Sequence, residues 1–90
     1  MSAVTDNAAK KRFELEEQGE LAFADYTRRD GVLTIPHVEA AMALRGTGAA
    51  GRLMEGMLAI VRERGMKVRP ICPYAVAFIQ RHPEYRDLVA

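Results

Sequence analysis

The chain has 90 residues, of which 49% are hydrophobic and 28% charged, a composition typical of a globular protein and unlike that of a disordered one. We expect a single domain spanning residues 1–90, because this length supports one hydrophobic core and leaves no room for a second. Thirteen basic and twelve acidic residues give a net charge of +1, which argues against broad electrostatic attraction to nucleic acid or an anionic membrane. Any anion site must therefore be local.

The single cysteine and the hydropathy of the sequence argue against a disulfide-bonded, zinc-binding, secreted or membrane-spanning protein. The single cysteine, Cys72, has no partner for an internal disulfide, and no zinc-type spacing of Cys and His is present. Residues 1–12 lack the apolar core of a signal peptide, and no apolar run approaches the ~18 residues of a membrane span. We expect a cytoplasmic protein without a metal and without membrane association.

Alternating apolar and polar residues predict a β-hairpin near the start of the chain. Phe13 and Leu15 alternate with glutamates and lead into a short turn at residues 18–20, after which Leu21 to Arg28 forms the second strand. Residues 4–7 suit either a further strand or a turn.

A second turn leads into a third antiparallel strand. The pair Asp30-Gly31 tolerates positive φ and delivers the chain into a strand over Val32 to Glu39. Pro36 falls inside this strand and removes a ladder donor, so we expect a bulge, an edge or a strand break near it.

The second half of the chain contains an amphipathic helix over Ala50 to Arg64. Arg62 and Arg64 occupy its last turn, where cations are favoured, and Gly65 lies where a C-terminal glycine cap belongs. The apolar positions recur at steps of three and four residues and form one stripe: Leu53, Met54, Met57, Leu58, Ile60 and Val61. We expect this stripe to face the core.

A strand over Met66 to Cys72, parallel to the strand before the helix, would complete a βαβ unit. Pro73 then suits the first position of a helix that continues over Tyr74 to Arg81, and a short turn over Glu84 to Val89 follows. The predicted fold is α/β, with a mixed and mostly antiparallel sheet.

The segment Arg45 to Gly51 is the best candidate for a binding site. Its three glycines and two alanines let the backbone approach a ligand closely, and its amides precede the positive end of a helix. Arg45 and Arg52 would add charge-assisted contacts to a phosphate or pyrophosphate. The alternative is a flexible connection without a ligand. The spacing matches neither a P-loop nor the dinucleotide fingerprint.

The pattern Arg45-x-x-Gly48-x-Ala50 resembles the Q/R-x-x-G-x-G/A signature of GNAT acetyltransferases, which bind the pyrophosphate of coenzyme A there. The resemblance extends over roughly residues 4–89, and over this range the sequence resembles a small single-domain GNAT-like subfamily. It is carried by the segments Phe13-Glu14-Leu15, Gly19-Glu20, Asp30 to Leu33, His37 with Glu39, Leu44 to Gly46, Glu63 to Gly65, Cys72-Pro73 and Arg81 to Tyr85.

The resemblance implies a minimal GNAT fold in which the strands before and after the long helix splay apart to bind acetyl-CoA. The pantetheine arm would pair with the first of these strands near Val38. The implied cofactor-binding residues are Val38, Arg45, Gly46, Thr47, Gly48, Ala49, Ala50, Gly51, Arg52, Arg81 and His82. For Arg81 and His82, which would meet the adenosine or its phosphate, a solvated helix end is an equal alternative.

The candidate catalytic residues are His37, Glu39, Cys72 and Tyr74. His37 and Glu39 alternate with Val38, so their side chains should share one sheet face, where either could take a proton from an amine. A hydrogen-bonded strand histidine and a solvated glutamate are the plain alternatives. Cys72 would lie beside the acyl group as a relay or a pocket wall, or simply pack as a small buried residue. Tyr74 is a candidate general acid, with core packing as its alternative.

These observations predict an acetyl-CoA-dependent N-acetyltransferase acting on an amine, with a protein or peptide amine among the acceptors, through an open acceptor site. A non-catalytic acyl-CoA-binding or regulatory module is the main alternative, because the catalytic residues are specified more weakly than the phosphate loop. A small partner-binding domain without any coenzyme is the third. The acceptor, the acyl-chain preference and the oligomeric state are not determined by the sequence.

Overall fold

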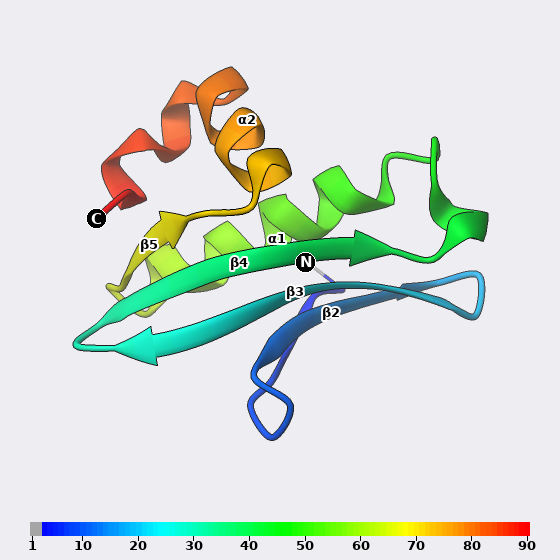
Figure 1. Cartoon of the computed structure of the whole chain (residues 1–90), viewed down its shortest axis with the longest axis horizontal. Helices are drawn as coiled ribbons and strands as arrows, with labels where there is room; N and C mark the ends of the chain where they lie inside the picture. The colour runs from blue at the N-terminus through cyan, green and yellow to red at the C-terminus, as the bar shows by residue number, and fades with distance from the viewer. Residues whose placement is uncertain (1–2) are drawn as a thin grey trace.

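The computed structural model describes residues 3–90, which fold around one five-stranded sheet in the order β1-β2-β3-β4-β5 (Figure 1). The strands are β1 (Thr5–Asn7), β2 (Arg12–Glu17), β3 (Glu20–Arg29), β4 (Val32–Ala40) and β5 (Lys67–Pro70). Strands β1 to β4 are antiparallel neighbours, whereas β5 pairs with β4 in parallel. The predicted mixed, mostly antiparallel sheet is confirmed.

The turns between the long strands form where their residues accept positive φ. Gln18 and Gly19 have φ of 55° and 73°, and Asp30 and Gly31 have φ of 52° and 77°. These values suit two-residue connections whose twist matches that of the flanking strands. The hairpin and the Asp30-Gly31 turn are therefore formed as predicted.

Helix α1 (Ala49–Glu63) crosses one face of the sheet, and α2 (Pro73–Arg81) lies beside it near β5 (Figure 1). The predicted apolar stripe of α1 is buried against the sheet, except that Ile60 is only partly buried. Strand residues that alternate along β2 and β3, including Phe13, Leu15, Ala22 and Ala24, complete this core from the other side. Burial of these side chains fixes the position of α1 and so the position of its N-terminus.

The boundaries of several elements differ slightly from the predicted ones. A short β1 forms within residues 4–7, and the final segment is a 3-10 helix, η2 (Pro83–Leu88). Strand β5 is shorter than the predicted strand over residues 66–72, because its pairing with β4 ends at the pair Ile35 and Pro70. Within residues 3–90, no helix combines the length and hydrophobicity needed to cross a membrane.

A β-bulge interrupts the pairing of β3 with β4 at Pro36. The register moves from the pair Asp25 and His37 to the pair Thr27 and Thr34, so Tyr26 faces two residues of β4, Ile35 and Pro36. The bulge shifts the alternation of faces by one residue. Before it, odd-numbered residues such as Leu33 and Ile35 face the core, and after it the even-numbered residues Val38 and Ala40 do. The irregularity predicted at Pro36 is therefore a bulge.

Candidate functional site

The loop before α1 enters the helix through a glycine in the left-handed conformation. A one-turn 3-10 helix, η1 (Met42–Leu44), leads into the loop, and Gly48 occupies the N-cap of α1 with φ 86° and ψ 6°. Thr47 fixes this turn, because its hydroxyl donates to the carbonyl of Leu44 at 2.5 Å and accepts from the N–H of Ala49 at 3.3 Å. A left-handed N-cap of this kind is adopted easily only by glycine.

Several N–H groups at this helix start have no acceptor within residues 3–90. These are the amides of Gly46, Gly48, Ala50 and Gly51, whereas that of Ala49 is satisfied by Thr47. The first turn of α1 contains no acidic side chain that would compete for them. The positive end of the helix dipole acts in the same place, so an anion would be held by both effects.

Next to this loop, β4 and β5 separate. Their pairing ends at Ile35, whose carbonyl accepts hydrogen bonds from the N–H groups of both Ile71 and Cys72 at 3.0 Å. Beyond this point β4 continues to Ala40 without pairing to β5. The N–H of Ala41 bonds to Leu21 in the β3 direction. Along an antiparallel strand, successive residues point their N–H and C=O groups alternately toward the partner strand and away from it. The backbone N–H and C=O groups of Val38 and Ala40 therefore point away from β3, toward the gap.

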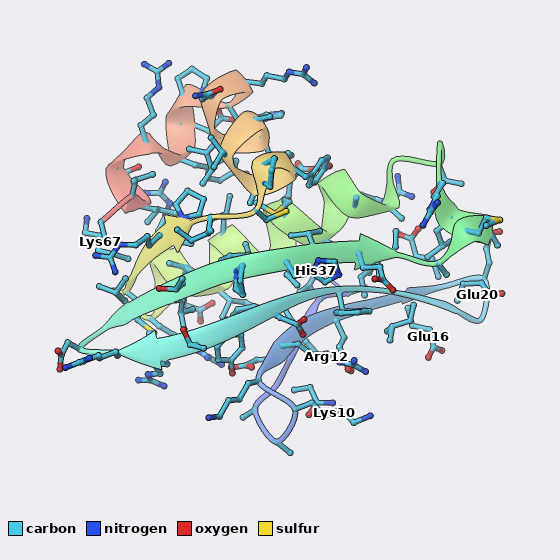
Figure 2. All side chains as sticks on the ribbon, in the orientation of Figure 1. Lys10, Arg12, Glu16, Glu20, His37 and Lys67 are labelled. Carbon is cyan, nitrogen blue, oxygen red and sulfur yellow. The ribbon has the colours of Figure 1, made fainter. Side chains whose placement is uncertain are left out.

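His37 and Glu39 occupy the sheet face opposite to α1, as a consequence of the bulge. His37 lies on β4 (Figure 2). Its Nε2 and the Oε1 of Glu39 lie 3.0 Å apart, and 53% of each side chain is exposed. The ring of Phe23 lies beside the imidazole, with the ring centroids 6.1 Å apart. The two predicted base candidates therefore share a face and form a hydrogen-bonded pair that solvent can reach.

Cys72 and Tyr74 lie on the side of α1 instead. Cys72 precedes α2 as its N-cap and is only 8% exposed. The hydroxyl of Tyr74 reaches the first turn of α1, where it lies 3.9 Å from the position that a Cβ on Gly51 would occupy. Burial raises the pKa of Tyr74, although nearby Arg81 acts in the opposite direction. The structure thus brings Tyr74 to the first turn of α1, whereas His37 and Glu39 lie on the other face of the sheet.

The predicted basic contacts differ in their availability. Arg45 and Arg81 are exposed, and neither has an ion-pair partner within residues 3–90. Nδ1 of His82 lies 2.8 Å from the carbonyl of Phe78, and the two rings stack with centroids 4.0 Å apart. Arg52 donates two hydrogen bonds to Glu17, at 2.8 and 2.7 Å. His82 and Arg52 thus already have structural partners.

One neighbour of the loop was missed by sequence reasoning. Glu17 lies at the end of β2, 35 positions before Arg52, and no spacing rule connects residues so far apart across a sheet. The only signal was a glutamate next to a predicted turn, which on its own indicates a solvated side chain. The contact depends on how α1 crosses the sheet.

Comparisons with known proteins agree with this geometry. The sequence profile of the GCN5-related N-acetyl-transferase family matches residues 12–88. The solution structure of a protein from Staphylococcus aureus, described as GCN5-like, has the same fold, with a TM-score of 0.67 at 21% sequence identity, over 100% of this chain and 91% of that chain. A search of curated proteins gives no match. The profile spans both the loop and the splayed strands, and the chain therefore belongs to the GCN5-related N-acetyltransferase family.

Proposed function

We propose that the protein is an acetyl-CoA-dependent N-acetyltransferase that acts on an amine through an open acceptor site. The observation that carries the proposal is a set of N–H groups at the start of α1 that have no acceptor in the described part of the chain, beside the gap between β4 and β5. Family membership supports acetyl transfer as the reaction class. The fit of the loop to a pyrophosphate supports coenzyme A as the carrier.

Different residues around the loop would bind different parts of coenzyme A. The amides of Gly48, Ala50 and Gly51 would hold the pyrophosphate, and Arg45, which has no ion-pair partner among residues 3–90, would add charge. The free backbone groups of Val38 and Ala40 would pair with the pantetheine arm, as an added strand pairs with a sheet edge. Bound in this way, acetyl-CoA would supply the acetyl group as a thioester.

His37 and Glu39 would take the proton of the acceptor amine. A carboxylate only accepts hydrogen bonds, so Glu39 fixes the imidazole with its hydrogen on Nε2 and leaves Nδ1 as the basic nitrogen. An amine must be neutral to act as a nucleophile, and an oriented imidazole is suited to deprotonating it. Glu39 thus orients His37, and the two act as one base.

Tyr74 and Cys72 would act on the coenzyme side of the sheet. The hydroxyl of Tyr74, like that of any tyrosine, is protonated at neutral pH, as a proton donor to a leaving thiolate must be. Cys72 is mostly buried beside the gap, which supports either a wall of the acyl site or a thiol that relays the acetyl group. Acceptor and coenzyme would then approach from opposite faces.

The solvent exposure of His37 and Glu39, the proposed general base and its partner, supports a large acceptor. His37 and Glu39 are each about half exposed on the outer sheet face, so an amine presented on a protein or peptide can reach them without entering a closed pocket. A protein or peptide amine is therefore the acceptor class that we propose.

A non-catalytic acyl-CoA-binding module is the second candidate. The separation of His37 and Glu39 from Cys72 and Tyr74 favours it, because the candidate catalytic groups do not converge on one side of the sheet. Binding of coenzyme A would then be retained without transfer.

Two measurements test the proposal. Calorimetric titration with coenzyme A tests binding in the wild type and in Gly48→Val, whose side chain would obstruct the loop. Thiol release from acetyl-CoA, measured over a panel of amines and peptides, then tests catalysis. Binding without thiol release, together with an unchanged intact mass for protein and peptides, would support the second candidate. A wild type that does not bind coenzyme A would contradict both.

A further inference from the structure

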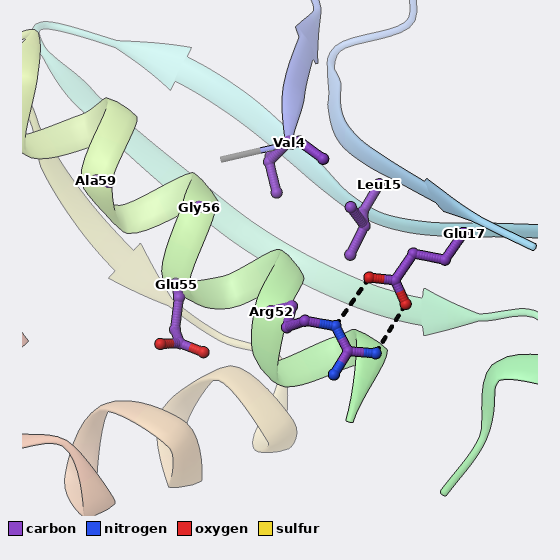
Figure 3. Close-up of a pocket in the computed structure, with 8 residues that line it drawn as sticks. Val4, Leu15, Glu17, Arg52, Glu55, Gly56 and Ala59 are labelled. Atoms are coloured by element: carbon purple, nitrogen blue, oxygen red, sulfur yellow. Dashed lines mark hydrogen bonds and ion pairs between the residues drawn. The ribbon is translucent and has the colours of Figure 1, made fainter. Parts of the chain in front are cut away.

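Arg52 is held by Glu17 in a geometry that leaves one guanidinium nitrogen unused. Nε of Arg52 donates to one carboxylate oxygen of Glu17 at 2.8 Å, and Nη2 donates to the other at 2.7 Å (Figure 3). This is a bidentate pair, in which the planar fork of arginine fits both oxygens of a carboxylate. The third nitrogen, Nη1, takes no part in it.

The unused nitrogen faces the phosphate loop. A Cβ built on Gly48 would lie 3.1 Å from Nη1 of Arg52, so this nitrogen lies directly against the N-cap of α1. The backbone N–H of Arg52 also donates to the carbonyl of Gly48 at 3.0 Å. Nη1 is therefore a further N–H donor close to the N-cap of α1, in addition to the loop amides that have no acceptor within residues 3–90.

Within residues 3–90, Glu17 is the residue that hydrogen-bonds to the guanidinium of Arg52, and Glu55 adds an electrostatic attraction without a hydrogen bond. Arg52 and Glu17 lie at one end of an open groove of about 380 Å³, whose walls include Leu15, Gly56 and Ala59. Gly56 and Ala59 are too small to support a long side chain from the flank of the helix. A free arginine loses considerable side-chain entropy when it is fixed, so an anchor of this kind determines where the charge lies.

Glu17 is a rigid and fully charged anchor. It is the last residue of β2 and pairs with Glu20 across the hairpin turn, so its backbone is fixed by the sheet. Its hydrogen bond with Arg52 lowers the pKa of Glu17 and raises the pKa of Arg52. Both groups therefore stay ionised at neutral pH.

We propose that Glu17 is a positioning residue for the pyrophosphate of coenzyme A. It holds Arg52 through two nitrogens so that the third, Nη1, donates to the phosphate at the loop. The inference rests on the proposed coenzyme A binding and adds to it a residue of β2 that is far from the loop in sequence but adjacent to it in space. Glu17 itself does not touch the ligand, and a carboxylate in direct contact with a phosphate would only repel it.

The chain offers a matched control at the other end of the same helix. Arg62 in the last turn of α1 forms a bidentate pair with Asp87, at 2.7 and 3.0 Å. The two arginines are similarly exposed, at 48% for Arg52 and 47% for Arg62, whereas Glu17 is less exposed than Asp87, at 25% against 62%. Exposed pairs of this kind contribute little to stability, so Glu17→Gln and Asp87→Asn should have similar small effects on the melting temperature.

The test is calorimetric titration of coenzyme A into the wild type, Glu17→Gln, Asp87→Asn, Arg52→Gln and the double variant of Glu17 and Arg52. We expect Glu17→Gln to weaken binding by about fivefold to tenfold, the range for losing one oriented charge-assisted contact. Asp87→Asn should bind like the wild type. The double variant should bind like Arg52→Gln, because Glu17 acts only through Arg52.

Three outcomes would overturn the inference while leaving coenzyme A binding intact. Glu17→Gln could bind as well as the wild type, or more tightly, which would mean that the carboxylate merely opposes the anion. Glu17→Gln could weaken binding equally in the presence and absence of Arg52, which would show an independent effect. Asp87→Asn could weaken binding as much as Glu17→Gln, which would show a general effect of helix stability. Failure of the wild type to bind coenzyme A would instead overturn the proposed function, and this inference with it.

Discussion

Substitution of Gly48 by alanine tests whether the loop before α1 binds coenzyme A, when its effect on affinity is compared with its effect on protein stability. Gly48 has φ 86°, where an L-residue is strained by about 1–2 kcal/mol. For a domain of this size, each 1 kcal/mol lowers the melting temperature by about 4–8 °C. The added Cβ would also lie 3.1 Å from Nη1 of Arg52, so the guanidinium must shift by a few tenths of an ångström from its position beside the loop. We expect the affinity for coenzyme A to fall by about tenfold, which is 1.4 kcal/mol.

Gly31→Ala provides the control for backbone strain. Gly31, in the turn before β4, has φ 77°, so alanine there is strained in the same way, but no atom of residues 3–90 beyond its chain neighbours lies within 4 Å of its Cβ position. The melting temperatures of the two variants should fall by similar amounts in a thermal scan. Only Gly48→Ala should lose affinity in a calorimetric titration. Equal affinities of the two variants for coenzyme A would refute the role assigned to the loop.

Three further predictions concern catalysis, pH and the core. His37→Gln should lower turnover by about a hundredfold or more while the affinity for coenzyme A stays unchanged. Glu39→Gln should lower turnover by a smaller factor. A turnover equal to that of the wild type in His37→Gln would exclude His37 as the base. Burial, aided by a 2.6 Å hydrogen bond to Asp6, raises the pKa of Tyr26 from 10.0 to about 12, so the protein should lose stability as the pH rises between these values. Alkaline denaturation should show a smaller loss over this range in Tyr26→Phe, and an identical loss would contradict the assignment. Leu53→Ala should lower the free energy of unfolding by about 2–5 kcal/mol in a denaturant titration, because Leu53 is fully buried, and a loss below about 1 kcal/mol would contradict its place in the core.

The local features of the fold could be predicted from the sequence because they depend on neighbouring residues. The Asp30-Gly31 turn and the apolar stripe of α1 each follow from propensities within a few positions. The presence of a bulge at Pro36 was also foreseeable, since proline lacks a ladder donor. Which residues lie on which side of the bulge depends on register, and this is set by the pairing of whole strands.

The candidate site was predictable to the extent that it is local. His37 and Glu39 share a strand, so the alternation of side chains alone places them together. That Cys72 and Tyr74 lie on the other side of the sheet depends on where β5 leaves β4, which no short pattern encodes. The pairing of Glu17 with Arg52 likewise requires the crossing of α1 over β2, which is a property of the packed core.

The open stretch of β4 beyond Ile35 also has a consequence for handling the protein. An unpaired strand edge is a template for pairing with other chains, and many proteins cover or charge such edges to avoid aggregation. Here the residues that point their backbone groups into the gap, Val38 and Ala40, have small apolar side chains without charge. We therefore expect the ligand-free protein to self-associate more readily at high concentration than the same protein saturated with coenzyme A.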